Sequence, residues 1–312
     1  MHAFAFVFPG QGSQSVGMLD AWGDHPAVRQ TLEEASASLG EDVAALIHAG
    51  PKEALDLTTN TQPAMLTAAI ACYRAWRAEG GSEPAAVAGH SLGEYSALVV
   101  AGALTLADAL PLVRFRAQAM QQAVPVGAGA MAAILGLEAA AVRDGCAAVA
   151  AESGEVVAPA NFNDPKQTVI AGSKAGVDLA CEKLKSLGAK RALLLAVSAP
   201  FHSSLMKPAA ESLRVRLASV TIVAPRIPVV NNVDVAVQTD PDAIREALYR
   251  QAFGPVRWVE VTQALRARGL LHIFECGPGK VLSGLVKRVD ADIQSLAVLD
   301  PASLQLAKEM LQ

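Results

Sequence analysis

One serine is the centre of the most informative stretch of this sequence. Residues 89–93 read Gly-His-Ser-Leu-Gly. This is the G-x-S-x-G pattern of a nucleophile elbow, in which the serine occupies a sharp turn between a strand and a helix. The apolar run at 85–88 predicts the strand, and the helix is expected from about residue 93. Glycine on either side removes the Cβ clashes of such a turn. The pattern therefore predicts that the Ser91 hydroxyl lies at a helix N-terminus, where N–H groups and the helix dipole stabilise an oxyanion.

A serine nucleophile requires a base within hydrogen-bond reach, and the chain offers six histidines. His202 is the preferred candidate, because it lies in a loop between a predicted strand and a predicted helix, where catalytic residues tend to occur. His90 adjoins the serine, but neighbours on a sharp turn point apart, so we expect it to support the elbow. A backbone carbonyl could orient the imidazole. The alternative is a carboxylate, for which the candidates near loops are Asp164, Asp234 and Asp240.

Two further polar residues have positions that need explaining. Arg116 lies at the edge of an apolar helical stripe within residues 106–124. An arginine there is expected either to bind a substrate group or to meet a structural carboxylate. Gln11 lies between Gly10 and Gly12, in a loop after the first predicted strand. This loop is either a flexible turn or a backbone shaped to approach a ligand.

The elements that must position these residues alternate between strand and helix. Strands are expected at 3–8, 85–88, 227–230, 270–276 and 295–299, with helices between them. This order predicts an α/β fold with a mostly parallel sheet flanked by helices, and ligands bind outside the carboxyl ends of such strands. The order βαββαβ at 129–197 predicts a ferredoxin-like subdomain. We therefore expect a large domain made of 1–126 and 198–312, with 127–197 inserted into it.

Composition excludes several classes of protein. The chain has 312 residues, 52% of them hydrophobic, and a net charge of −4, which gives no reason to expect a nucleic-acid partner. The four cysteines are widely spaced, so neither a zinc site nor a redox motif is indicated, and reduced thiols favour a cytoplasmic protein. No apolar run reaches 18 residues, so no membrane span is expected. The loop at 277–280 lacks the phosphate-loop pattern.

Taken together, the motifs resemble one family, the malonyl-CoA:acyl-carrier-protein transacylases of type II fatty acid synthesis. The resemblance covers almost the whole chain. It rests on the segments at 8–14, 61–63, 89–96, 129–131, 161–163, 197–202, 231–233 and 275–280, together with Arg116 and Gln251. It implies a hydrolase-like α/β domain with a ferredoxin-like insert, and a transfer of malonyl from CoA to acyl carrier protein. No metal or redox cofactor is implied.

The resemblance also implies roles for individual residues. Ser91 would be the acylated nucleophile and His202 its base, with the main-chain carbonyl of Gln251 orienting the imidazole. Arg116 would hold the malonyl carboxylate through a bidentate fork. Two groups would form the oxyanion hole, the side chain of Gln11 and the N–H of Leu92. The supporting residues would be His90, Asn161 and Asn231. Phe201 resembles a malonyl-type signature, and Cys276 receives no role.

The implied partner, acyl carrier protein, is acidic, as is this chain. Docking should therefore use a local basic patch, for which the candidates are Lys190, Arg191, Lys280, Lys287 and Arg288. The same residues could instead be ordinary solvated surface. We expect the chain to act as a monomer.

Rival interpretations share only part of the pattern. A serine esterase would need a triad carboxylate and no buried arginine. A patatin-like lipase would use the Asp-Gly pair at 144–145, which falls in a predicted helix of the insert. A non-catalytic carrier-binding module would not need both Ser91 and His202. A standalone acyltransferase of polyketide synthesis would have the same chemistry and the same residues.

Overall fold

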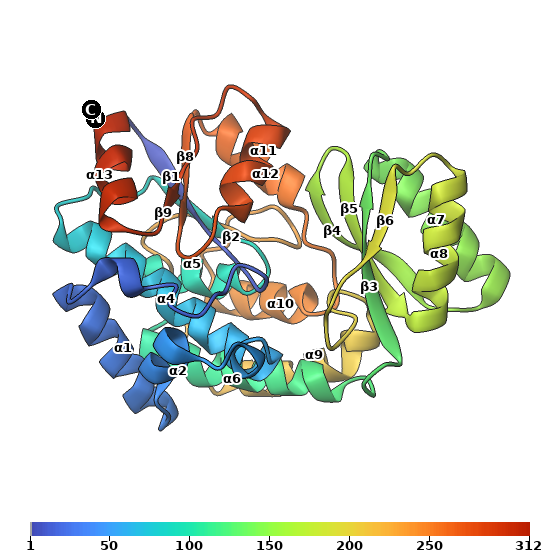
Figure 1. Cartoon of the computed structure of the whole chain (residues 1–312), viewed down its shortest axis with the longest axis horizontal. Helices are drawn as coiled ribbons and strands as arrows, with labels where there is room; N and C mark the ends of the chain where they lie inside the picture. The colour runs from blue at the N-terminus through green and yellow to red at the C-terminus, as the bar shows by residue number, and fades with distance from the viewer. Residues whose placement is uncertain (1) are drawn as a thin grey trace.

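A computed structural model of the chain describes residues 2–312 and contains two separate sheets (Figure 1). The larger sheet has five strands in the order β7-β2-β1-β8-β9. Every pairing in it is parallel, as expected from the alternation of strands and helices. Its strands are β1 (Phe4–Phe8), β2 (Ala86–Gly89), β7 (Val229–Val230), β8 (His272–Cys276) and β9 (Ala297–Val298).

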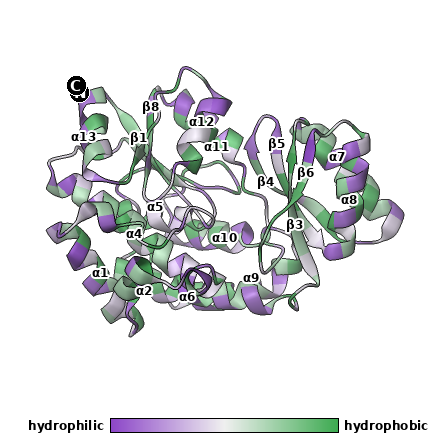
Figure 2. Ribbon diagram, in the orientation of Figure 1, coloured by the Kyte–Doolittle hydropathy of each residue, from purple (hydrophilic) through white to green (hydrophobic). Residues whose placement is uncertain are grey.

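Side-chain alternation along β1 explains how helices cover both faces of this sheet. Phe4, Phe6 and Phe8 point into one core cluster, while Ala5 and Val7 point into the other. Helices α11 (Trp258–Ala267) and α12 (Val281–Val289) contribute to the Ala5 and Val7 side. The larger core contains residues of α1 (Pro26–Leu39), α4 (Thr58–Ala78), α5 (Gly93–Val100), α6 (Leu106–Gln122), α9 (Lys207–Ala218), α10 (Pro241–Gln251) and α13 (Pro301–Met310). Figure 2 shows apolar residues running along β1 and β8 between these layers.

The smaller sheet is antiparallel, in the order β4-β5-β3-β6. It follows the predicted βαββαβ order, with one face covered by the two helices (Figure 1). The other face carries a small apolar cluster that includes Met131 and Val169 and packs against Phe201. The elements are β3 (Gly129–Leu135), α7 (Ala139–Ser153), β4 (Val157–Asp164), β5 (Gln167–Ser173), α8 (Lys174–Ser186) and β6 (Arg191–Leu194).

Strand β4 joins the small sheet to the rest of the molecule. The N–H of Phe162 donates to the carbonyl of Val256 at 2.9 Å, and the N–H of Val256 donates to the carbonyl of Ala160 at 2.8 Å. At the end of the same strand, Arg288 of α12 donates to Asp164 at 2.7 Å. These bonds fix the segment between α10 and α11, and the end of α12, to the small sheet.

Some boundaries differ from those expected. The residues around Pro63 predict a helix that begins at Thr61, with the proline near its first position. Helix α4 instead begins at Thr58, so Pro63 lies inside it. The carbonyl of Leu57 accepts from the N–H groups of both Asn60 and Thr61, which starts the helix about one turn early. Strands β6 and β7 are shorter than the strands that the sequence predicts at 190–197 and 227–230. Four short helices were not predicted, and they are η1 (Asp20–Trp22), α2 (Val43–Ala49), α3 (Lys52–Leu55) and η2 (Ser204–Met206). None of the helices in residues 2–312 is both long and apolar enough to cross a membrane.

Candidate active site

Ser91 stands in the turn between β2 and α5, in a backbone conformation that side chains rarely adopt. Its φ angle is 52°, in the left-handed region. The two flanking glycines are required by close packing. A Cβ at Gly89 would lie 1.9 Å from backbone atoms of Gly93, and a Cβ at Gly93 would lie 2.0 Å from the carbonyl oxygen of Phe8. The turn therefore presses the start of α5 against β1 and β2 and exposes the serine hydroxyl at the helix N-terminus.

His202 contacts this hydroxyl directly. Its Nε2 lies 2.7 Å from Ser91 Oγ, and its Nδ1 lies 2.9 Å from the carbonyl oxygen of Gln251 and 3.1 Å from that of Gly254. Because carbonyl oxygens only accept, Nδ1 carries the proton, and Nε2 is left to accept from the serine. Burial, with the charge of Arg116 as the next cause, lowers the pKa of His202 to about 3. The imidazole is therefore neutral and able to act as a base.

None of the three candidate carboxylates contacts His202. Asp164 pairs with Arg288, Asp234 pairs with Arg250, and Asp240 caps the N-terminus of α10. Two backbone carbonyls occupy the position that a triad carboxylate would take.

Arg116 reaches the same hydroxyl from α6. Its side chain is buried, with Nη1 donating to Gln62 Oε1 at 2.7 Å, and Nη2 donating to Gln251 Oε1 at 3.1 Å and to Ser91 Oγ at 3.2 Å. Its Nε has no hydrogen-bond partner within residues 2–312, and the guanidinium lies over the ring of Tyr95. It forms no ion pair in the described part of the chain. A buried cation beside the nucleophile is suited to bind an anionic group of a ligand.

A buried polar network behind these groups was not predicted from the sequence. Glu94 Oε2 accepts from the N–H of Asn232 and from Gln251 Nε2. Asn232 in turn accepts from the N–H of Ser91 at 2.7 Å and donates to the carbonyl of Gly89 at 2.6 Å. Burial raises the pKa of Glu94 to about 7. The residue predicted for this support, Asn231, instead bonds to Asp234. Its neighbour Asn232 therefore holds the elbow.

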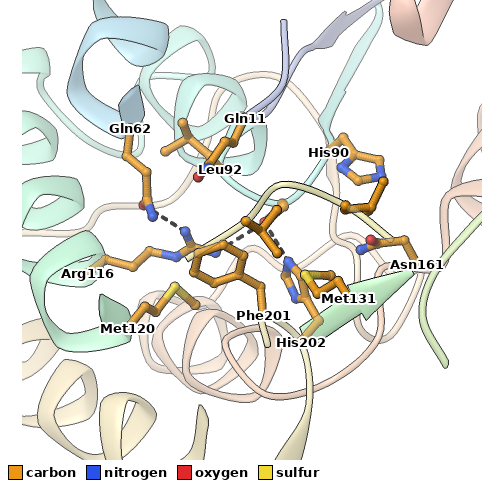
Figure 3. Close-up of a pocket in the computed structure, with 13 residues that line it drawn as sticks. Gln11, Gln62, His90, Leu92, Arg116, Met120, Met131, Asn161, Phe201 and His202 are labelled. Atoms are coloured by element: carbon orange, nitrogen blue, oxygen red, sulfur yellow. Dashed lines mark hydrogen bonds between the residues drawn. The ribbon is translucent and has the colours of Figure 1, made fainter. Parts of the chain in front are cut away.

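The pocket in front of Ser91 is mainly apolar (Figure 3). Arg116 enters it from one side, while His202, His90 and Asn161 lie on the other. Its apolar walls are Leu92, Met120, Met131, Leu195, Val197 and Phe201.

Gln11 and Leu92 bring two further hydrogen-bond donors to this pocket. Gln11 lines it and accepts from Thr58 Oγ1 through Oε1, which leaves its NH₂ group free to donate. The N–H of Leu92, the N-cap residue of α5, has no hydrogen-bond partner within residues 2–312. These two donors line the same pocket as the serine and can receive an oxyanion. His90 turns to Asn163, with 2.8 Å between Nε2 and Oδ1.

The remaining residues singled out in the sequence lie outside the pocket. Lys190, Arg191, Lys280 and Lys287 are exposed, and Arg288 is exposed but paired with Asp164. Cys276 is fully buried in the core.

The chain resembles known proteins along nearly its whole length. The family model described as "Acyl transferase domain" matches residues 5–299. The chain is 53% identical over 311 residues to the malonyl CoA-acyl carrier protein transacylase of Escherichia coli K12, covering 99% of this chain and all of that protein. The crystal structure of the acyl-carrier-protein S-malonyltransferase of Burkholderia pseudomallei is 63% identical, with a TM-score of 0.97 over 99% of this chain and all of that one.

A third similar structure is a complex. It is a malonyl-transacylase bound to a type II polyketide synthase acyl-carrier protein, 49% identical, with a TM-score of 0.97 over 99% of this chain and all of that one. These full-length likenesses show that the chain belongs to the acyl transferase domain family and, within it, to the malonyl CoA-acyl carrier protein transacylases.

Proposed function

We propose that this chain transfers the malonyl group from malonyl-CoA to the phosphopantetheine thiol of an acyl carrier protein, through an ester on Ser91, for fatty acid synthesis. The observation that carries the proposal is the buried guanidinium of Arg116 lying 3.2 Å from the serine hydroxyl. An acyl group on this serine that ends in a carboxylate would meet a cation within the same pocket. An esterase acting on neutral esters has no use for that cation.

In the first half-reaction, Ser91 Oγ attacks the thioester carbonyl while its proton passes to Nε2 of His202. The carbonyl oxygen becomes an oxyanion, which the N–H of Leu92 and the amide of Gln11 stabilise. Collapse of this intermediate breaks the carbon–sulfur bond, and CoA leaves as a thiol with the proton from His202. In the second half-reaction, the carrier thiol gives its proton to His202 and attacks the ester. The proton returns to Ser91 as its oxygen leaves.

Arg116 selects the acyl group in this scheme. A carboxylate that accepts from the guanidinium offsets its burial, whereas an acetyl group leaves the charge unpaired in an apolar pocket. The Gln62 and Gln251 amides hold the guanidinium in place. Nη2 of Arg116 contacts Ser91 itself. The malonyl carboxylate can therefore bind Arg116 while the malonyl carbonyl is bonded to Ser91. We assign to docking of the acidic carrier protein the exposed basic residues Lys190, Arg191, Lys280, Lys287 and Arg288.

Acylation measured by intact mass tests this proposal. The wild type and Arg116→Ala are incubated with malonyl-CoA and with acetyl-CoA, with Ser91→Ala as the blank, and the modified peptide is mapped. We expect malonyl on Ser91 in the wild type, and loss of malonyl with retained or increased acetyl in Arg116→Ala. Equal loading of both groups by the wild type would favour an esterase or a broader acyltransferase over the function proposed here.

A polyketide-type acyltransferase is the second candidate, because one similar structure is bound to a polyketide carrier protein. Its chemistry would be the same, so only the carrier distinguishes the two. The rate of transfer to purified fatty-acid and polyketide carrier proteins decides between them.

A further inference from the structure

Glu94 is a buried carboxyl group that hydrogen bonds connect to Arg116. Three carboxyl side chains are buried within residues 2–312, and they are those of Glu94, Asp164 and Glu275. Asp164 pairs with Arg288, and Glu275 accepts from a backbone N–H in the first turn of α12. Of the three, Glu94 is the one whose contacts lead to the substrate pocket.

One amide joins this carboxyl group to the guanidinium. Gln251 Nε2 donates to Glu94 Oε2 at 3.0 Å, and Gln251 Oε1 accepts from Arg116 Nη2 at 3.1 Å. The donor end of the amide thus faces the carboxyl group, and its acceptor end faces the cation. This is the orientation that an ionised Glu94 favours. Glu94 and Arg116 are each 2% exposed, so little water screens one charge from the other.

The groups around Glu94 leave Arg116 as its counter-charge. Burial raises the pKa of Glu94 to about 7, while hydrogen bonds and the charge of Arg116 oppose that rise. Asp234, after β7, raises the pKa further, but this carboxylate is paired with Arg250 of α10. Burial is the main cause that lowers the pKa of both histidines of the site and raises the pKa of the tyrosine beside Arg116, so these three groups are neutral at pH 7.

A malonyl group on Ser91 would bring a second carboxylate to the same cation. Arg116 Nη2 lies 3.2 Å from Ser91 Oγ, so the guanidinium is within reach of an acyl group on that serine. Two carboxylates beside one buried cation disfavour each other's ionised form. Malonyl therefore favours the protonated form of Glu94. An acetyl group carries no charge and leaves Glu94 as the counter-charge of Arg116.

A proton can reach Glu94 without crossing the substrate pocket. Glu94 lines a second, small cavity at α5 and α10, together with the polar side chains of Asn231 and Gln238. None of the residues that line this cavity lines the pocket in front of Ser91. Glu94 can therefore exchange its proton while an acyl group occupies that pocket.

We propose that Glu94 is a specificity-determining residue of this reaction, whose ionised form competes with the malonyl carboxylate for Arg116. The inference rests on the function proposed above. When malonyl loads onto Ser91, an ionised Glu94 takes up one proton from solvent and becomes a neutral carboxylic acid. When acetyl loads, Glu94 keeps its charge.

The preference for malonyl over acetyl therefore depends on pH. At low pH Glu94 is already protonated and Arg116 is free for malonyl. As the pH rises, Glu94 ionises in the free enzyme, and malonyl must displace that negative charge, so the preference weakens. The competition is in binding, so saturating malonyl-CoA leaves the rate of acylation unchanged.

Competitive loading tests the proposal. The wild type and Glu94→Gln are brought to equilibrium with malonyl-CoA, a fixed excess of acetyl-CoA and free CoA, and the two acyl-enzymes are measured by intact mass from pH 6 to 8.5. In the wild type we expect the ratio of malonyl to acetyl on Ser91 to fall about three- to tenfold over this range. In Glu94→Gln the ratio should stay constant. Because both donors carry the same CoA, ionisation of CoA cancels in the ratio.

Proton uptake tests the same step without a variant. At pH 7.5 about three-quarters of Glu94 is ionised if its pKa is about 7. Loading the wild type with malonyl-CoA in weak buffer with a pH indicator should therefore take up about half to three-quarters of a proton per site. Loading with acetyl-CoA should take up none, and neither should malonyl loading of Glu94→Gln.

Glu275→Gln is the matched control, because it removes a buried carboxyl group that has no contact with Arg116 or Gln251. It should behave as the wild type does in both measurements. A constant ratio in the wild type, a lack of proton uptake, or the same pH dependence in Glu94→Gln would overturn the role of Glu94. So would an equal loss of pH dependence in Glu275→Gln. Failure of the wild type to form malonyl-Ser91 at any pH would instead overturn the proposed function itself.

Discussion

Arg116 Nη2 and Ser91 Oγ lie 3.2 Å apart, so the cation that would bind the substrate carboxylate also touches the nucleophile. The same hydroxyl lies 2.7 Å from His202 Nε2. A positive charge this close has two effects. It favours the ionised form of the serine during attack, and it disfavours protonation of the histidine. Substrate binding and base strength are therefore linked through one side chain.

The pH dependence of acylation should show this link. The pKa of His202 is lowered to about 3, first by burial and then by Arg116. The base therefore stays neutral well below pH 6.5, the usual pKa of a histidine. We expect the single-turnover rate of acylation by malonyl-CoA to be flat between about pH 5 and 7.5, measured by rapid quench and intact mass. A midpoint near pH 6.5 that persists in Glu94→Gln would show that the imidazole titrates normally.

The sequence located the reacting groups better than their supports. Ser91 is recognised from glycines two positions away, and His202 from its loop. Their partners are distant in sequence: Asn232 lies 141 positions from Ser91, and Gln62 lies 54 positions from Arg116. Contacts of this kind follow from the packing of β2, β7 and α4, which no local pattern encodes. The parallel sheet and the βαββαβ insert were predicted because periodicity and element order are local. The early start of α4 was not predicted, because its N-cap residue, Leu57, has no side chain that could cap a helix and so mark its start.

Removing the side chain of Asn232 should loosen the elbow. Its amide joins the N–H of Ser91 to the carbonyl of Gly89, and both groups would be left unpaired by alanine. We expect Asn232→Ala to lower the free energy of unfolding by about 2–4 kcal/mol and to slow acylation at least tenfold. Urea denaturation and single-turnover loading measure the two effects. Asn231→Ala, one position away with its side chain on Asp234, is the control. Equal effects of the two variants would argue against a specific role for Asn232.

Glu94 should make stability depend on pH in an unusual direction. Its pKa is raised by burial to about 7, so the folded state binds a proton between about pH 4.5 and 7 where the unfolded chain does not. The wild type should therefore lose stability as the pH rises through this window, by up to about 3 kcal/mol.

A glutamine at this position removes the titration but keeps an oxygen that accepts from Asn232 and Gln251. We expect the difference in free energy of unfolding, wild type minus Glu94→Gln, to fall between pH 4.5 and 7. Urea titrations at several pH values measure it. A constant difference would show that Glu94 does not titrate in this range. Glu94→Ala should be less stable than Glu94→Gln at every pH, because it leaves both donors unpaired.

The contact between His90 and Asn163 should link the small sheet to the reaction. Asn163 lies on β4 and accepts from the residue that precedes the nucleophile, with 2.8 Å between Nε2 and Oδ1. Alanine would leave the N–H of the half-buried imidazole unpaired, so the turn around Ser91 would lose a fixed support. We expect Asn163→Ala to lower kcat for malonyl transfer about five- to twentyfold with little change in KM.

Arg288→Ala breaks the neighbouring link between β4 and α12 at Asp164, without touching His90. Because this second contact does not involve His90, its loss should lower stability and leave kcat within about twofold. A similar fall in kcat for both variants would mean that the small sheet acts on the site as a whole, and not through His90.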